Sequence, residues 1–375
     1  MALEVRGIAV QEEVEATYRD VDQWRGEFRR PVRVVPAVAV NVEPQLTVLP
    51  ASRASEPLSF SVRLIAEEPG GIAGSLRFDV PEGWRVEPDS VPIRFASAGE
   101  ELVREFTIHP PAEVDQERFV VQAVFIDESG RRFDRGYSLV DYEHIHPRPL
   151  FRSATIDVQA LDAELPENLR VGYIASTGDP VPATLAELGV DVVLLTPDDL
   201  ASAPLDDFDA IVVGIRAYEG RPDLVAHNQR LLDYVAEGGT AIVQYNQYQY
   251  TTPGLAPYPI EMARPHDRIT DHTAEVTLLD PQHRVFTTPN RITDADFEGW
   301  IQERGLYFLN SWDDRYSPLM EMADPGEDPK RGGLVIAEYG EGTYVYTGLA
   351  LFRQLPAGVP GAYRLFANLL ALGAE

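Results

Sequence analysis

The spacing of apolar residues changes once along this 375-residue chain, close to Leu169. Before that point, from Val34 to about Tyr142, short runs such as LSFSVRLIAE and ERFVVQAVFID alternate with turn sequences such as PEGW and DESG. A spacing of two places one apolar face on each strand, and no helical spacing interrupts these runs. The segment 34–145 is therefore predicted to form an immunoglobulin-like β-sandwich.

The second pattern alternates strands with helices. Its strands are nearly continuous apolar runs, RVGYIAS, DVVLLT, AIVVGIRA and TAIVQYN, which are typical of buried parallel strands. Before the last of these runs, one helix face carries Leu224, Leu231, Leu232 and Val235, and the helix ends at a pair of glycines. Residues 169–375 are therefore predicted to form a doubly wound α/β sheet with an antiparallel addition near its end.

Two further stretches fit neither pattern. Residues 1–33 are polar, which predicts a linker or strap, and residues 146–168 contain prolines, which predicts a linker between the domains. Acidic residues interrupt the first apolar stretch, so no signal peptide is expected in this chain. The sequence does not determine the cellular compartment. The protein would be periplasmic or extracellular if a longer parent protein carries a signal peptide upstream, and cytoplasmic otherwise.

Composition argues against several classes of function. Asp and Glu outnumber Lys and Arg by 60 to 32, a formal net charge of −28, whereas binding to nucleic acid requires clustered cations. The sequence has no apolar run of about 18 residues, the length that crosses a bilayer, so no membrane span is expected. The absence of cysteine removes disulfides, thiolate metal ligands and a cysteine nucleophile.

Candidate ligand-binding residues lie where the predicted strands end. In an open α/β sheet, ligands bind at the loops that follow the carboxyl ends of the strands. Four such loops are STGD (176–179), GIRAYEGR (214–221), QYNQYQY (244–250) and GLALFRQLP (348–356). They carry the candidate site residues Asp179, Arg216, Tyr218, Gln244, Tyr245, Asn246, Arg353 and Gln354.

This set of side chains suits a polar ligand such as a carbohydrate. Arg216 and Arg353 can each form a bidentate bond to a carboxylate or phosphate, and the tyrosines can stack on sugar rings. Asn246 and Gln354 would then hydrogen-bond to hydroxyl groups. The alternative is that each arginine pairs with an Asp or Glu of the chain and holds its own loop in place.

The same loops offer no recognisable catalytic set. Ser176 and Thr177 follow the first strand without the glycine-flanked context of a nucleophile elbow. STGDPVP has one glycine and lacks the P-loop lysine, so no nucleotide cofactor is predicted. His144 and His146 could bind a metal with Asp141, but packing at the domain junction is the preferred interpretation, and no metal is predicted.

The C-terminal region of large bacterial PIG-L/LmbE-type deacetylases resembles this chain in three stretches, DAIVVGIRAYEGRPDLVAHNQRLLDYVAEGGTAIVQYN, DFEGWIQERGLYF and LFRQLPAGVPGAYRLFANLL. In those proteins an N-terminal zinc domain removes an N-acetyl group from an amino sugar. A β-sandwich follows, and then a domain of the class I glutamine amidotransferase type. The resemblance begins at about Tyr18, but the His-Pro-Asp-Asp zinc motif of the deacetylase domain occurs nowhere in the sequence.

The resemblance implies a flavodoxin-like sheet without its nucleophile. In active glutamine amidotransferases a cysteine follows the strand that corresponds to residues 240–243, and here Tyr245 or Asn246 stands in its place. Neither a phenol nor an amide can replace a thiolate as the nucleophile in amide hydrolysis. The favoured function is a non-catalytic accessory region that binds a carbohydrate, or a PIG-L deacetylase domain in cis or trans. The alternatives are a stand-alone hydrolase acting on a sugar or amide, and a structural module that forms homo-oligomers.

Overall fold

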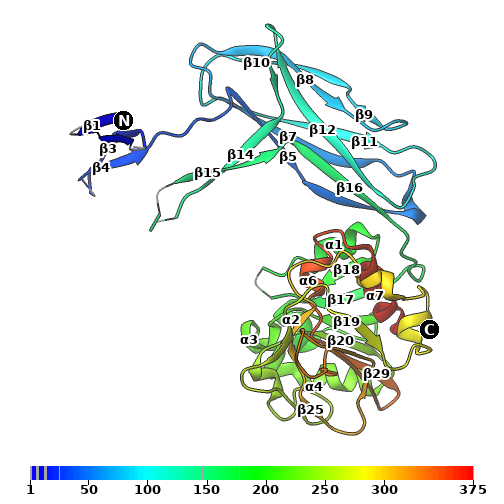
Figure 1. Ribbon diagram of the computed structural model, residues 1–375. Helices are drawn as coiled ribbons and strands as arrows, with labels where there is room; N and C mark the ends of the chain where they lie inside the picture. The colour runs from blue at the N-terminus through cyan, green and yellow to red at the C-terminus, as the bar shows by residue number, and fades with distance from the viewer. Residues whose placement is uncertain are drawn as a thin grey trace. The chain divides into compact units, whose positions relative to one another are not determined.

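The protein divides into two compact units in its computed structural model (Figure 1). The residues described are 2–5, 8–11, 15–24, 26–142, 144–145, 147–176 and 178–374. The first unit comprises Met1–Gln45, Ser55–Pro111 and Phe119–Asp157, and the second comprises Leu46–Ala54, Ala112–Arg118 and Val158–Glu375. Two short stretches from within the range 34–145 therefore belong to the second unit.

The first unit is built from strands. Those that lie wholly or mostly within it are β1 (Ala2–Val5), β2 (Ile8–Gln11), β3 (Thr17–Asp22), β4 (Gly26–Pro31), β5 (Val38–Glu43), β7 (Leu58–Ala66), β8 (Ile72–Asp79), β9 (Arg85–Glu87), β10 (Ser90–Phe95), β11 (Glu101–His109), β12 (Arg118–Asp127), β13 (Arg132–Phe133), β14 (Arg135–Val140) and β15 (Arg148–Ser153). Strand β16 (Thr155–Leu161) crosses the division between the units, which falls after Asp157. One antiparallel sheet has the order β5-β7-β11-β9. In another, β8 lies between β10 and β12, and β13 pairs with β12.

Aromatic side chains join these two sheets. Phe60 on β7 and Phe106 on β11 have ring centroids 5.5 Å apart, and Phe78 on β8 lies 4.6 Å from Phe106. Phe60, Val62 and Leu64 are all buried, so every second residue of β7 faces the core. The all-β part that the alternating pattern predicted is confirmed.

Both stretches expected to be linkers contain strands. Within residues 146–168, β15 pairs antiparallel with β14, and β16 buries alternate residues, among them Ile156 and Val158. The period of two in TIDVQAL is typical of a strand, although prolines precede it in the sequence. Within residues 1–33, β3 and β4 form an antiparallel hairpin.

The second unit contains the helices. Its elements are β6 (Leu46–Pro50), β17 (Arg170–Ile174), α1 (Val181–Glu187), β18 (Asp191–Leu194), α2 (Pro197–Ser202), β19 (Ala210–Val213), α3 (Ala217–Gly220), α4 (Pro222–Ala236), β20 (Thr240–Gln244), β21 (Ile260–Glu261), β22 (Asp267–Ile269), β23 (Val276–Leu278), α5 (Arg284–Thr287), β24 (Gly305–Phe308), β25 (Ser311–Trp312), β26 (Ser317–Pro318), β27 (Met320–Met322), β28 (Leu334–Tyr339), β29 (Gly342–Thr347), α6 (Leu351–Gln354) and α7 (Pro360–Leu370). Short 3-10 turns lie at Ala51–Arg53, Tyr248–Thr251, Asp294–Phe297 and Ala371–Gly373.

The central sheet of the second unit has the strand order β18-β17-β19-β20-β29-β28-β26. Strands β18 to β29 of this order run parallel, and β28 and β26 continue the sheet antiparallel. Val212 and Ile242 pack in one apolar cluster with α1 and α7, whereas Val213 and Val243 pack in another with α4. Helices therefore cover both faces, and the predicted α/β part is confirmed.

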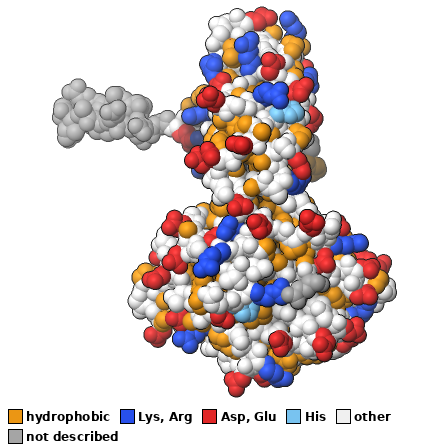
Figure 2. Space-filling model, turned by 90° about the vertical axis from the view of Figure 1, so that its right-hand side faces the viewer, with side chains coloured by type: hydrophobic (Ala, Val, Ile, Leu, Met, Phe, Trp, Pro, Cys, Tyr) orange, Lys and Arg blue, Asp and Glu red, His pale blue; other side chains and the backbone are white. Residues whose placement is uncertain are grey.

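Helix α4 follows the apolar spacing seen in the sequence. Leu224, Leu231, Leu232 and Val235 are all buried, and Gly238 follows the helix with a φ of 116°, a conformation that suits glycine. Among the described residues, no helix is both long and apolar enough to cross a membrane. On the face drawn in Figure 2, Asp and Glu side chains are spread over the surface with basic side chains between them.

Candidate functional site

The carboxyl edge of the parallel strands is where a ligand is expected. Strands β18 and β19 lie on opposite sides of β17, so the chain leaves β17 and β19 in different directions and the loops diverge there. The candidate residues predicted from the sequence lie on the loops after β17, β19 and β20, at the end of β20, and on α3 and α6. Several of these side chains, however, form hydrogen bonds or ion pairs with other residues of the chain.

Asp179 and Gln244 meet through the phenol of Tyr173. Asp179 accepts hydrogen bonds from the Tyr173 hydroxyl (2.8 Å) and from the backbone N–H groups of Val181 (3.1 Å) and Ile215 (3.2 Å). Burial raises the pKa of Asp179. Gln244 is fully buried and donates from Nε2 to the Tyr173 hydroxyl (2.7 Å). These side chains hold the loops after β17 and β19 against the sheet.

Asn246, Tyr218 and Gln354 are also engaged in the protein. Asn246 accepts from the backbone N–H of Tyr218 (2.9 Å) and donates to the Gln244 carbonyl (2.9 Å). The Tyr218 hydroxyl donates to Asn228 (2.6 Å). Gln354 accepts from the N–H of Ile301 (2.8 Å) and donates to the carbonyl of the same residue (3.0 Å). All three predicted residues are buried, so they position loops and are not open to a ligand.

Arg216 and Arg353 each pair with a glutamate, as the alternative interpretation expected. Arg216 Nε lies 2.8 Å from Glu219, and Arg353 Nε lies 2.9 Å from Glu303. The Arg216 side chain is 52% exposed and that of Arg353 35%, so both can also reach a ligand. The Arg216 backbone has a φ of 55° and its N–H donates to the Tyr245 carbonyl (3.0 Å).

Tyr245 belongs to a row of stacked rings that the sequence analysis did not identify. Its ring centroid lies 5.0 Å from that of Phe352 and 5.8 Å from that of Tyr307, and the rings of Tyr245 and Tyr307 are 14° from parallel. Tyr307 stacks on His266 at 3.8 Å, and both lie against Tyr248, at 5.6 and 6.5 Å. We call Phe352, Tyr245, Tyr307, His266 and Tyr248 the aromatic row. Tyr245 is buried and the others are half-buried, so part of the row faces solvent.

An arginine lies at each end of the aromatic row. The guanidinium carbon of Arg353 is 4.8 Å from the centroid of Phe352, and that of Arg264 is 4.2 Å from the centroid of Tyr248. Both distances are in the range of cation–π contacts. Arg264 is exposed, and no carboxylate of the described residues pairs with it.

A β-bulge places Tyr307 in the row. Strands β22 and β24 pair antiparallel, but Asp267 faces Phe308 while Arg268 faces Leu306. Tyr307 is therefore the extra residue of β24, and its φ of 53° is left-handed. This is rare for a bulky residue. The Tyr307 carbonyl accepts a hydrogen bond from the Tyr346 hydroxyl (2.5 Å), which helps to hold this conformation.

Burial favours the neutral forms of Tyr245, Tyr307 and His266 in the row. Burial raises the pKa of Tyr245, and the guanidinium groups of Arg216 and Arg353 oppose that rise. Burial lowers the pKa of His266, and the charge of Arg268 acts in the same direction. The row therefore combines uncharged rings with cationic ends.

The sequence also offered His144 and His146 as possible metal ligands and Thr177 as a possible nucleophile. His146 and Thr177 fall outside the described residues, and His144 is exposed. Within the ranges that the structure describes, no group of three or more His, Cys, Asp or Glu side chains is placed to hold a metal ion.

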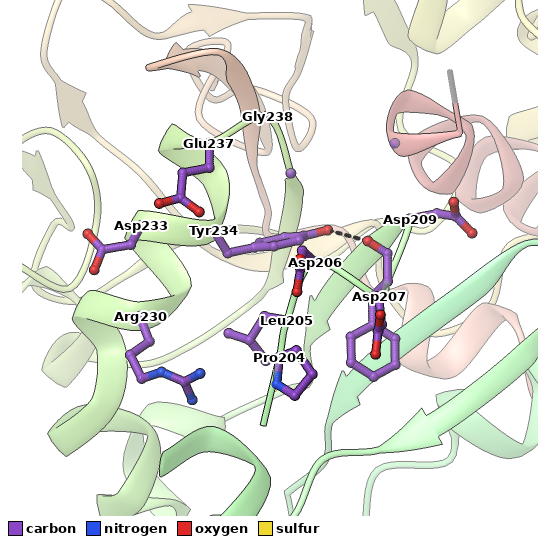
Figure 3. A pocket seen from close by; sticks show the side chains of 13 residues that line it. Pro204, Leu205, Asp206, Asp207, Asp209, Arg230, Asp233, Tyr234, Glu237 and Gly238 are labelled. Atoms are coloured by element: carbon purple, nitrogen blue, oxygen red, sulfur yellow. Dashed lines mark hydrogen bonds between the residues drawn. The ribbon is translucent and has the colours of Figure 1, made fainter. Parts of the chain in front are cut away.

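A separate pocket of about 550 Å³ lies at the opposite edge of the same sheet (Figure 3). It lies between the loop that precedes β19 and the C-terminal end of α4, and the Tyr234 hydroxyl donates to the Phe208 carbonyl (2.9 Å) across it. Its acidic lining residues are Asp206, Asp207, Asp209, Asp233 and Glu237. The helix C-terminus adds to this negative charge, so the electrostatic character of the pocket is opposite to that of the arginine-flanked aromatic row.

No protein-family model and no curated protein matches the chain. Solved structures similar to it include a FixG-related protein from Vibrio parahaemolyticus, with 13% identity over 26% of this chain and 91% of that one and a TM-score of 0.20. Another is the periplasmic chaperone SfaE, with 6% identity over 34% and 59% of the two chains and a TM-score of 0.20. A third is the CARDB domain of the PF1109 protein in complex with di-metal ions from Pyrococcus furiosus, with 14% identity over 33% and 91% and a TM-score of 0.20. Likenesses at this TM-score carry no argument about the fold or function of this chain.

Proposed function

We propose that this chain is a non-catalytic accessory region of a PIG-L/LmbE-type deacetylase protein, and that its aromatic row binds a carbohydrate. The observation that carries the proposal is Tyr307, which has a left-handed backbone and stacks within the row at the carboxyl edge of the sheet. Such a conformation costs roughly 1–3 kcal/mol and persists where the surroundings impose it, most often at ligand sites. A ring held in this way suits recognition of a ligand.

The turn after β20 supports a binding role over hydrolysis. The ring of Tyr245 is part of the row, and the amide of Asn246 is hydrogen-bonded to Tyr218 and Gln244. A hydroxyl nucleophile needs a base within hydrogen-bond reach. In the part of the chain that the structure describes, no Ser or Thr hydroxyl is hydrogen-bonded to a His side chain.

The strand order supports the family resemblance that the sequence suggested. Numbered along the chain, the parallel strands β18, β17, β19, β20 and β29 have the order 2-1-3-4-5, which is that of flavodoxin-like sheets. We infer that the second unit is a flavodoxin-like domain of the class I glutamine amidotransferase type. We infer likewise that the two packed sheets of the first unit form an immunoglobulin-like sandwich.

Carbohydrate is the ligand class that fits the row best. Aromatic faces pack on the C–H faces of sugar rings, while phenol, imidazole and guanidinium groups donate to hydroxyls. Single-stranded nucleic acid also uses aromatic rings and cations. Binding of a phosphate backbone requires clustered cations, whereas the arginines beside the row stand singly and two of them, Arg216 and Arg353, already pair with glutamates.

A glycan screen of the full chain, followed by calorimetry on the hits, tests the proposal. Tyr307→Ala should weaken binding at least about tenfold, which corresponds to about 1.4 kcal/mol. Tyr339→Ala is the matched control, because Tyr339 is a half-buried tyrosine of the same unit that packs against Tyr258 and not against the row. Unchanged binding by folded Tyr307→Ala, or the absence of any glycan ligand, would contradict the proposal.

A further inference from the structure

We infer that the saccharide bound by the aromatic row is acidic, with carboxylates held by Arg264 and Arg353 at the two ends of the row. The inference rests on the proposed function, since it names the ligand class of the same site. A uronic-acid oligosaccharide has this chemistry: sugar rings for the aromatic residues and a planar carboxylate for each guanidinium group.

The first argument is the charge of Arg264. The chain has 60 acidic residues to 32 Lys and Arg, so an arginine on its surface has an excess of carboxylates available. Arg264 nevertheless lies over the ring of Tyr248 at 4.2 Å, with no ion pair to any carboxylate among the described residues. Its exposed guanidinium group has its donors available to a ligand.

The second argument is the orientation of Arg353. It donates to Glu303 from Nε (2.9 Å), and no described residue accepts a hydrogen bond from either of its η nitrogens. The two η nitrogens can bind a planar carboxylate in the bidentate geometry that arginine favours. Contact with the half-buried ring of Phe352 at 4.8 Å keeps the guanidinium group at the end of the row.

The third argument is the balance of charge along the row. Arg216, Arg264 and Arg353 border the rings, and two glutamates, Glu219 and Glu303, pair with two of them. Asp267 and Arg268 beside His266 add one charge of each sign. Four positive charges against three negative charges leave one positive charge in excess. Arg216 donates to Glu219 from both Nε (2.8 Å) and Nη2 (3.4 Å), so it is the most fully neutralised of the three. It should contribute less to anion binding than Arg264 and Arg353.

The test compares oligogalacturonate with its methyl ester, which keeps the shape of the sugar chain and removes its charge. The intact chain should bind the acid at least about tenfold more tightly than the ester, and Arg264→Gln and Arg353→Gln should each lose about tenfold in affinity for the acid. Arg331→Gln is the matched control, because Arg331 is an exposed arginine of the same unit that pairs with Glu321. Added salt should weaken binding of the acid.

The outcomes separate this inference from the proposed function. Equal binding of acid and ester, with both arginine variants unaffected and Tyr307→Ala defective, would overturn the inference and leave carbohydrate binding standing. Binding of a neutral glycan alone, or of inorganic phosphate at these arginines without oligogalacturonate, would also overturn it. Failure of every saccharide in the glycan screen would remove the proposed function, and the inference with it.

Discussion

The ring of Tyr307 lies on the ring of His266, with centroids 3.8 Å apart and planes 9° from parallel. His266 immediately precedes β22 and Tyr307 is the extra residue of β24, so the contact depends on the short ladder between these strands. Rings stacked this closely leave no space for a ligand between them. A bound sugar would therefore contact the outer surfaces of the row, formed by the half-buried rings of Tyr248 and Phe352 and the free edges of the stacked pair.

The left-handed backbone of Tyr307 predicts that glycine is better tolerated there than alanine. A non-glycine residue in this region costs roughly 1–2 kcal/mol, whereas glycine adopts it freely. Tyr307→Gly should therefore be more stable than Tyr307→Ala by about 1 kcal/mol, measured by urea denaturation with an unchanged m-value. At Tyr248, whose φ is not positive, the order should be reversed. Equal stability of the two Tyr307 variants would argue against backbone strain at this position.

The lowered pKa of His266 predicts that acid destabilises the second unit. In the unfolded chain histidine titrates near pH 6.5, and in the folded state burial moves its pKa below that value. Between the two pKa values the unfolded state binds more protons, so stability is full above about pH 6.5 and decreases as the pH falls through this window. His266→Phe should reduce this slope in unfolding curves at pH 7.5, 6.5 and 5.5. A histidine pKa measured by NMR above 6.5 for His266 would contradict the assignment.

Sequence patterns predicted the framework of the second unit better than they predicted its site. The helix with Leu224, Leu231, Leu232 and Val235 on one face is present as expected, because apolar periodicity reports burial directly. Tyr245 was identified because it follows a strand of the sheet. Tyr248 lies in the same loop, but His266, Tyr307 and Phe352 lie on segments distant in the sequence, and a single bulged residue with a left-handed φ brings Tyr307 and His266 into contact. No local pattern of residue types encodes that register shift.

Buried Arg304 is expected to be a structural residue of the same unit. It is 5% exposed, and it donates to the Ala274 carbonyl from Nε (3.0 Å) and Nη2 (2.8 Å) and to the Phe297 carbonyl from Nη1. Burial lowers its pKa to about 10, so it remains charged at neutral pH. Arg304→Met leaves these carbonyls without their donors and should cost about 2 kcal/mol of unfolding free energy. Exposed Arg268→Met is the control, and a similar small effect for both variants would contradict the structural role.

Gln244, which the sequence placed among the ligand-binding residues, is expected to tolerate an apolar replacement. It is fully buried, its Nε2 donates to the Tyr173 hydroxyl, and its Oε1 has no hydrogen-bond partner among the described residues. A buried acceptor without a partner costs about 1–3 kcal/mol, whereas a single hydrogen bond contributes about 0.5–1.5 kcal/mol.

Gln244→Met would remove both the lone acceptor and the bond to Tyr173 while keeping a side chain of similar shape. The Tyr173 hydroxyl would still donate to Asp179 (2.8 Å), so the substitution leaves no donor without a partner. The variant should therefore be as stable as the wild type, or more stable by up to about 1 kcal/mol. Gln244→Glu is the contrasting variant, because a carboxyl group at this buried position should be strongly destabilising. A loss of more than about 1 kcal/mol in Gln244→Met would mean that Oε1 has a hydrogen-bond donor in solution, such as a buried water or the polar group of a ligand.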